Sequence, residues 1–140
     1  IEIELSTPPW LPNASGDSDK VAQVLANLVE NAVKYTPGGG RVDVVLEHEG
    51  DRIRFEVHDP GLGIPPGEQE RIFEKFYRLD PNLTRGIGGT GLGLYICREL
   101  MRRMDSDIHV DSTVGVGSTF WFDLPVAAPV ERVAEPIGSA

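Results

Sequence analysis

Residues 17–37, DSDKVAQVLANLVENAVKYTP, carry the strongest helical pattern in this chain of 140 residues. Apolar side chains recur there at three- and four-residue spacing, at Val21, Val24, Leu25, Leu28 and Ala32. Asp17-Ser18-Asp19 offers N-cap residues before the pattern, and Thr36-Pro37 followed by three glycines ends it. The stretch therefore predicts an amphipathic helix with one buried face.

Strands are predicted on both sides of this helix. Residues 41–49 and 52–59 alternate apolar and polar side chains around a tight turn at Gly50-Asp51. A sheet with one apolar and one charged face needs a single covering layer. Residues 1–5, IEIEL, alternate in the same way and predict a half-buried strand.

The second half of the chain continues this pattern. Residues 67–77 carry Ile72, Phe73 and Phe76 at helical spacing, which predicts a short helix with both phenylalanines in the core or anchoring a lid. A further helix is predicted from about residue 92 to 104, and strands over 108–112 and 118–124. Residues 126–140 show neither period and predict a flexible C-terminal tail after one domain, 1–125. We expect an α+β fold in which helices cover one face of a mixed sheet.

The composition excludes several classes of function. With 22 acidic and 13 basic side chains the formal charge is -9, which argues against broad binding to nucleic acid or anionic lipid. No segment approaches the roughly 18 to 20 apolar residues of a membrane span, and no basic-then-apolar leader opens the sequence. These features predict a cytoplasmic fragment without direct membrane contact, in which any polyanionic ligand is held at a local site.

Four different polar functions share one edge of the first helix. Asn27, Asn31, Lys34 and Tyr35 span about 100° of its circumference beside the apolar face. Amide oxygens can complete the shell of a hard cation, a lysine can neutralise phosphate, and a tyrosine offers an aromatic plane to a base. The alternative is an ordinary solvated helix face.

Two further segments suggest a nucleotide. Asp59, at the end of a predicted strand, can accept a hydrogen bond from an exocyclic amine such as adenine N6, and the following Gly61 and Gly63 allow close approach to a flat ring. Alternatively, this segment is a turn that ends the strand. Residues 86–94, GIGGTGLGL, form a glycine-rich loop that leads into a helix N-terminus, where phosphate is favoured; the alternative is a flexible linker. Arg78 could reach a terminal phosphate or cap its own helix.

In order along the chain, NLVENAVKYTP, DPGLGI, ERIFEKFYR and GGTGLGL, with VGVGSTFWFDLP closing the domain, resemble the N, G1, F, G2 and G3 boxes of bacterial sensor histidine kinases. These boxes belong to the catalytic and ATP-binding domain of that family. The resemblance covers nearly all of residues 1–125. It implies the two-layer, Bergerat-type α/β sandwich shared with gyrase, heat-shock chaperone and mismatch-repair ATPases, with ATP between the helices under a mobile lid.

The resemblance also implies roles for individual residues. Asn31 is the implied Mg²⁺ ligand, and it forms the implied catalytic set with Lys34 and Arg78, which contact phosphates. Asp59 is implied to accept from adenine N6, and Tyr35 to lie beside the ring. The full implied nucleotide-binding set is Asn27, Asn31, Lys34, Tyr35, Asp59, Gly61, Gly63, Ile64, Tyr77, Arg78, Gly89, Thr90, Gly91, Leu92, Gly93 and Thr119.

Some positions depart from the family pattern or separate its branches. Asn27 stands where the hydrolytic branches have a water-activating glutamate, so direct hydrolysis should be slow, and Glu30 is expected to be an exposed side chain. Pro60 replaces the usual asparagine after Asp59. Residues 104–107, Met-Asp-Ser-Asp, replace the usual glycine break, so the last helix lacks a glycine C-cap.

The family's phosphoacceptor histidine is missing. His48, His58 and His109 all lie in predicted strands, outside any H-E-x-x-x-P-L setting. The resemblance therefore implies a monomeric donor half that binds Mg-ATP and passes the γ-phosphoryl group to a histidine of its own dimerisation domain, and from there to a response regulator. Two alternatives stay open: a serine kinase of the same superfamily that acts on an anti-anti-sigma partner, and a non-enzymatic ATP-sensing module.

Overall fold

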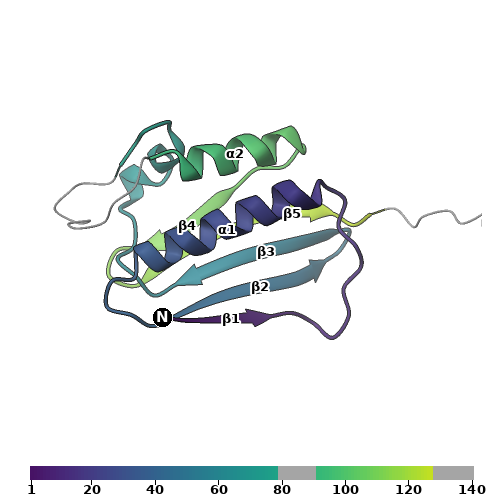
Figure 1. Ribbon diagram of the computed structural model, residues 1–140, viewed down its shortest axis with the longest axis horizontal. Helices are drawn as coiled ribbons and strands as arrows, with labels where there is room; N and C mark the ends of the chain where they lie inside the picture. Colours follow the sequence, from purple (N-terminus) through teal and green to yellow (C-terminus); the bar gives the residue numbers. More distant parts are fainter. Residues whose placement is uncertain (79–90, 128–140) are drawn as a thin grey trace, which may run out of the picture.

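A five-stranded sheet carries two α-helices on one face (Figure 1). The computed structural model describes residues 1–78 and 91–127. The elements follow the order β1 (Glu2–Ser6), α1 (Ser18–Lys34), β2 (Arg41–Glu49), β3 (Arg52–Asp59), the 3₁₀ turns η1 (Pro66–Glu68) and η2 (Arg71–Phe73), α2 (Gly93–Arg103), β4 (His109–Thr113) and β5 (Gly117–Pro125). The predicted α+β class and the single helical layer are confirmed.

The sheet has the strand order β1-β2-β3-β5-β4, with β1 parallel to β2 and the other neighbours antiparallel. Side chains of β3 alternate strictly between buried and half-buried, as the sequence predicted. Phe55 of β3 stacks on Phe122 of β5 with ring centroids 4.8 Å apart, and both rings lie in the core beneath the helices. The opposite face carries the charged residues of β3, and neither of the two described α-helices covers it.

Helix α1 begins and ends where its sequence signals indicate. The Asp17 carboxylate accepts hydrogen bonds from the backbone N–H groups of Asp19 and Lys20, at 3.0 and 3.2 Å. Val24, Leu28 and Ala32 are buried against the sheet. After the helix, the Thr36 hydroxyl donates to the Ala32 carbonyl at 2.7 Å. This fixed C-terminal end places Tyr35 beside the loop that follows β3.

The expectation of a half-buried β1 is wrong. All five of its residues are exposed, including Ile3 at 54% and Leu5 at 64%. Ile3 pairs with the buried Val42, so it points to the helical side of the sheet. Because α1 lies over β2 and β3 and no described helix covers β1, the alternating pattern predicted the strand but not its burial.

The predicted helix over residues 67–77 is also wrong, since two short 3₁₀ turns take its place. Glu74 is already extended, and Phe76 has a positive φ of 65°. Phe73 is buried as predicted, but Phe76 is 62% exposed. The backbone N–H of Phe76 donates to Gly91 O at 2.9 Å, so a contact with a distant segment holds this conformation in place of a helix.

Arg98 of α2 holds these turns against the rest of the domain. Its guanidinium bonds to carboxylate oxygens of Glu70 at 3.1 Å and Asp107 at 2.9 Å, and donates to Ile108 O at 3.1 Å. The same group lies 4.1 Å from the centre of the Phe73 ring. One largely buried cation therefore fixes η2, and with it one wall of the cleft described below.

Helix α2 ends without glycine, as its sequence indicated. Asp105 adopts a left-handed conformation with φ 57°. The N–H of Asp105 donates to Arg102 O at 3.1 Å and that of Ser106 to Met101 O at 2.9 Å. These two bonds form a Schellman motif in which an aspartate occupies the position that glycine usually takes.

Replacing Asp105 with glycine should raise the free energy of unfolding by about 0.5–1 kcal/mol, because glycine adopts the left-handed conformation without steric cost and a negative charge leaves the helix C-terminus. Urea unfolding of both proteins measures the difference. Asp105→Ala is the control, since it removes the charge but keeps the backbone strain and should therefore gain less than Asp105→Gly. Equal gains in both variants would assign the effect to charge alone.

The first two residues of the predicted tail make backbone hydrogen bonds to the domain. Val126 donates to Asp51 O at 2.8 Å and Ala127 to Asn13 O at 2.7 Å, so both residues belong to the domain. Residues 128–140 lie outside the described part of the chain. Within residues 1–78 and 91–127, neither α-helix combines the length and the apolar character that a membrane crossing requires.

Candidate functional site

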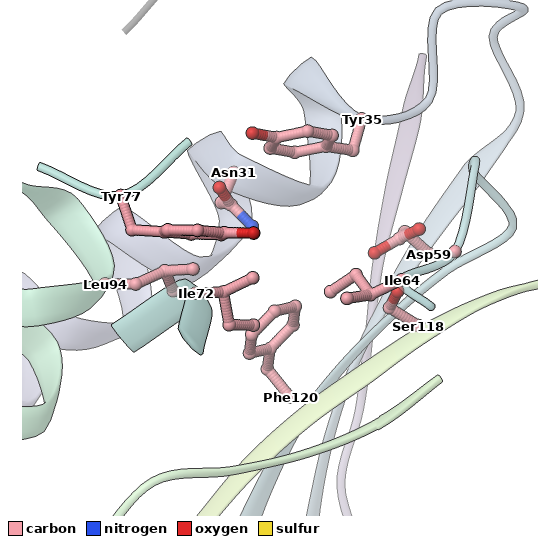
Figure 2. A pocket seen from close by; sticks show the side chains of 10 residues that line it. Asn31, Tyr35, Asp59, Ile64, Ile72, Tyr77, Leu94, Ser118 and Phe120 are labelled. Carbon is pink, nitrogen blue, oxygen red and sulfur yellow. The ribbon is translucent and has the colours of Figure 1, made fainter. Parts of the chain in front are cut away.

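A cleft with two adjoining halves lies beside α1, above β3 and β5. Five residues line both halves: Asn31, Tyr35, Ile72, Tyr77 and Leu94. The inner half is completed by Asp59, Gly63, Ile64, Ser118 and Phe120 (Figure 2). The outer half, of about 380 Å³, is completed by Gln23, Asn27, Glu30, Lys34, Arg78, Gly91, Leu92, Gly93 and Ile96. The fold thus gathers residues from most of the predicted motifs around one space.

The inner half is an apolar slot with a carboxylate at one end. Asp59 is only 7% exposed, and burial raises the pKa of its carboxyl group, against the lowering effect of backbone hydrogen bonds from Gly61 and Ser118 and of nearby His58. Its Oδ1 atom accepts from Gly61 N at 2.9 Å. Figure 2 shows Asp59, Tyr35 and Ile64 around the same space. Such a slot suits a flat heterocycle that offers an N–H donor to the carboxylate.

The glycines after Asp59 serve the protein backbone first. A Cβ atom at Gly61 would lie 1.9 Å from Tyr35 O, and one at Gly63, where φ is 76°, would lie 2.2 Å from Thr113 O. Leu62 N donates to the same Tyr35 carbonyl at 3.0 Å. The loop is therefore wedged between the end of α1 and the β4–β5 turn. Gly63 and Ile64 line the inner half, whereas Gly61 lines a separate hollow together with Thr36 and Pro60.

The outer half collects the polar edge of α1. Asn27, Asn31 and Lys34 all line it, as the spacing predicted. Glu30 is 70% exposed, as expected, but it also lines this half, and its Oε1 lies 3.9 Å from Lys34 Nζ. Across the space, residues 91–94 place the N-terminus of α2 at the cleft, and the aliphatic Leu92 before it has no side-chain acceptor to cap that helix.

Cations and a helix N-terminus make the outer half suited to an anion. Lys34 and Arg78 both line it. Burial raises the pKa of the Tyr35 hydroxyl, while the positive charge of Arg78 acts to lower it. A ligand with a planar apolar end and a polyanionic end therefore matches the cleft along its length.

The structure places Thr119 away from the cleft. Its hydroxyl lies 2.7 Å from His58 Nδ1 on the open face of the sheet. The neighbouring Ser118 and Phe120 line the inner half instead, because successive residues of β5 point to opposite faces. The sequence could have indicated Ser118, because it lies an even number of positions from the apolar Phe122 and Leu124 and therefore on the same face of the strand. Gln23, Ile72, Leu94 and Ile96 also line the cleft and were missed.

The remaining predicted site residues either line the cleft or lie outside the described part of the chain. Tyr77 lines both halves, and Gly91, Leu92 and Gly93 line the outer one. Gly89 and Thr90 lie outside the described residues.

Several relatives of this chain are named as sensor kinases. The chain is 44% identical over 111 residues to the sensor histidine kinase WalK of Bacillus subtilis, covering 78% of this chain and 18% of WalK. It is 45% identical over 120 residues to the adaptive-response sensory kinase SasA of Thermosynechococcus vestitus, covering 85% of this chain and 31% of SasA. The chain thus spans less than a third of these two relatives.

Solved structures agree with this likeness. Full-length ShkA in complex with AMPPNP superposes with a TM-score of 0.79 at 34% identity, over 98% of this chain and 28% of ShkA. The catalytic domain of histidine kinase ThkA, in a nucleotide-free form, gives 0.75 at 28% identity, over 89% of this chain and 78% of that domain.

The family model described as histidine kinase-, DNA gyrase B- and HSP90-like ATPase matches residues 16–128, a span that holds every cleft residue named above. The resemblance to the catalytic domain of sensor histidine kinases is confirmed. The chain belongs to the family of histidine kinase-, DNA gyrase B- and HSP90-like ATPases.

Proposed function

We propose that this domain binds Mg-ATP in the cleft and donates the γ-phosphoryl group to a histidine of a dimerisation domain. The observation that carries the proposal is the polarity of the cleft, with the buried Asp59 at one end and Lys34 and Arg78 at the other. Adenine occupies the inner half, where its N6 amine donates to the Asp59 carboxylate. The triphosphate extends along α1 towards the N-terminus of α2.

The donor set fits a magnesium ion that is held mainly by its nucleotide. Among the described residues, no group of three His, Cys, Asp or Glu side chains could hold a metal unaided. Mg²⁺ commonly binds through substrate phosphates, waters and one or two protein oxygens. Asn31 supplies such an oxygen at the junction of the two halves, with Asn27 one turn away. When bound, the ion neutralises phosphate charge.

The chain's own residues position and stabilise the transferring group. Lys34 and Arg78 contact phosphate oxygens and offset the negative charge that accumulates between donor and acceptor. A histidine nitrogen attacks the γ-phosphorus, the bond to the β–γ bridging oxygen breaks, and ADP leaves. Direct attack by water is slow because Asn27, an amide, is not a base and Glu30 is 70% exposed and faces Lys34. A response-regulator aspartate then receives the phosphoryl group.

Incubation with γ-labelled ATP and the histidine-bearing dimerisation domain tests this reaction. We expect acid-labile, base-stable label on the acceptor, and none on an acceptor whose histidine is replaced by glutamine. Acid-stable label on a serine-bearing partner would indicate the serine kinase instead. ATP binding without any transfer would leave a nucleotide-sensing module.

As the solution is made more acidic, ATP binding should weaken at a higher pH than the pKa of an ordinary aspartate would indicate. Because burial raises the folded-state pKa of Asp59 above its unfolded value, the folded protein takes up this proton at a higher pH. As the pH falls through that raised pKa, the acceptor for N6 is lost and the ATP-over-GTP affinity ratio should fall roughly tenfold. Protein stability changes in the opposite direction, since protonation removes the cost of a buried charge, a cost that returns as the pH rises.

Competition binding of ATP and GTP between pH 4 and 8 measures this ratio, in which the titration of the phosphates cancels. Asp59→Asn should show a low ratio at every pH. A wild-type ratio that does not vary with pH would contradict the adenine-binding role of Asp59.

A further inference from the structure

A chain of hydrogen bonds connects strand β4 to the inner half of the cleft. Ser112 Oγ in β4 lies 2.7 Å from Ser118 Oγ in β5, and Ser118 lines the inner half with Asp59. The Ser112 oxygen also accepts from Ile64 N at 2.7 Å and donates to Gly117 O at 3.0 Å. Ser112 itself does not line the cleft, yet it contacts two segments that do.

The number of protons decides the direction of the bond between the two serines. A hydroxyl has one proton to donate and two lone pairs that accept. If Ser112 donated its hydrogen bond to Ser118, its lone pairs would face the Gly117 carbonyl oxygen at 3.0 Å, and these two acceptor oxygens would repel each other. If Ser112 donates to Gly117 O, it accepts from both Ile64 N–H and the Ser118 hydroxyl, and every contact is a hydrogen bond.

Only lone pairs of Ser118 then remain for the cleft. Ser118 is 7% exposed and lines the inner half of the cleft, where a ligand can contact its hydroxyl oxygen; it also borders an open groove beside β4. It lies beside Asp59, which pairs with it across β3 and β5 and is also an acceptor. Two neighbouring acceptors suit a ligand edge that carries N–H donors, either directly or through a water molecule, and disfavour a carbonyl at the same place.

We propose that Ser112 is a positioning residue for purine specificity: by accepting a hydrogen bond from the Ser118 hydroxyl, it leaves Ser118 only lone pairs to offer the ligand, so that the cleft favours a 6-amino over a 6-oxo purine. The inference rests on the proposed function, because it assumes that the purine of ATP occupies the inner half. A residue of β4, outside the cleft, would thereby influence which purine base the cleft prefers.

Gln69 supports the same segment by a different route. Its Nε2 donates to Ile64 O and to Ser112 O, both at 3.0 Å, so it ties the loop after β3 to β4. Because these bonds are to backbone carbonyls, Gln69 has no effect on the direction of the hydrogen bond between the Ser112 and Ser118 hydroxyls. Loss of Gln69 should therefore loosen the cleft for every nucleotide, whereas loss of Ser112 should change which nucleotide is preferred.

The affinities of ATP and of ITP, which carries a 6-oxo group, measured by calorimetry on the same protein, test the proposal. Ser112→Ala frees the Ser118 proton to donate to a carbonyl, so the ATP-over-ITP ratio should fall about fivefold, as expected for one neutral hydrogen bond. Ser112→Thr retains the hydroxyl and should restore the ratio. Gln69→Met should weaken both nucleotides and leave the ratio unchanged.

Two controls separate specificity from folding. Ser106→Ala removes a serine hydroxyl that donates to Asp123 O at 2.6 Å, remote from the cleft, and should leave the ratio unchanged. In a Ser118→Ala background, adding Ser112→Ala should produce no further change in the ratio. A further change there, or an unchanged ratio in Ser112→Ala alone, would overturn the role of Ser112. Failure of the wild-type protein to bind ATP would instead overturn the proposed function.

Discussion

Replacing Asn31 with alanine should lower the affinity for Mg-ATP about 100-fold, equivalent to about 2.7 kcal/mol. Asn31 lines both halves of the cleft, so in the proposed binding mode its amide lies where the base and phosphate ends of the nucleotide meet. Alanine keeps the helix, since it has the highest helix propensity, but removes the oxygen offered to the metal. Calorimetric titration with ATP, with and without Mg²⁺, measures the loss.

The dependence on magnesium is the decisive part of this result. For Asn31→Ala, the affinity without Mg²⁺ should change much less than the affinity with it. Val33→Ala is the matched control, because Val33 lies on α1 outside both halves of the cleft. Equal losses with and without the ion would show that Asn31 contacts the nucleotide only, and an unchanged affinity would remove it from the site.

Gly61→Ala should destabilise the domain by about 3 kcal/mol and abolish ATP binding. The added Cβ would lie 1.9 Å from Tyr35 O and 2.8 Å from Asp59 Oδ1. The backbone must move away, which breaks the bond from Gly61 N that orients the Asp59 carboxylate. Urea unfolding and ATP titration of the same variant measure both losses.

Gly67→Ala is the control for this change, since it lies in the same connecting segment and a Cβ there meets no atom within 4 Å. It should bind ATP as the wild type does and unfold within about 0.5 kcal/mol of it. A Gly61→Ala variant with normal affinity would show that the loop after β3 can rearrange without moving Asp59.

The parts of the fold that were predicted correctly depend on local signals. Strands β2 and β3 have the predicted bounds because alternation and the Gly50-Asp51 turn lie within a single hairpin. Helix α1 follows from its Asp17 cap and its apolar face. The polar edge of that helix spans a 100° arc beside its buried residues. When the helix packs on the sheet by its apolar face, this edge lies along the flank of the helix, where the cleft is.

The errors depend on contacts between distant segments. Ile72, Phe73 and Phe76 fit a helical spacing, but the bond between Phe76 N and Gly91 O and the Arg98 contacts with Glu70 and Phe73 favour two turns. Burial of β1 depends on where the helices lie over the sheet, which its own alternation does not encode.

The site residues follow the same division between local motifs and contacts made only in the folded structure. Asp59 and Asn31 lie in motifs whose chemistry is visible in the residues themselves. The sequence analysis named Thr119, whereas its neighbour Ser118 lines the cleft, because one residue along a strand reverses the face. The hydroxyl chain through Ser112 joins β4 and β5 to the loop after β3, so only the folded structure brings its members together.

A crystal structure with Mg²⁺ and a non-hydrolysable ATP analogue tests the central claim most directly. We expect the adenine in the inner half, with N6 about 2.9 Å from an Asp59 oxygen, and the triphosphate along α1 between Asn31, Lys34 and Arg78. An analogue bound outside this cleft, or with its purine beside Lys34 and its phosphates towards Asp59, would contradict the account.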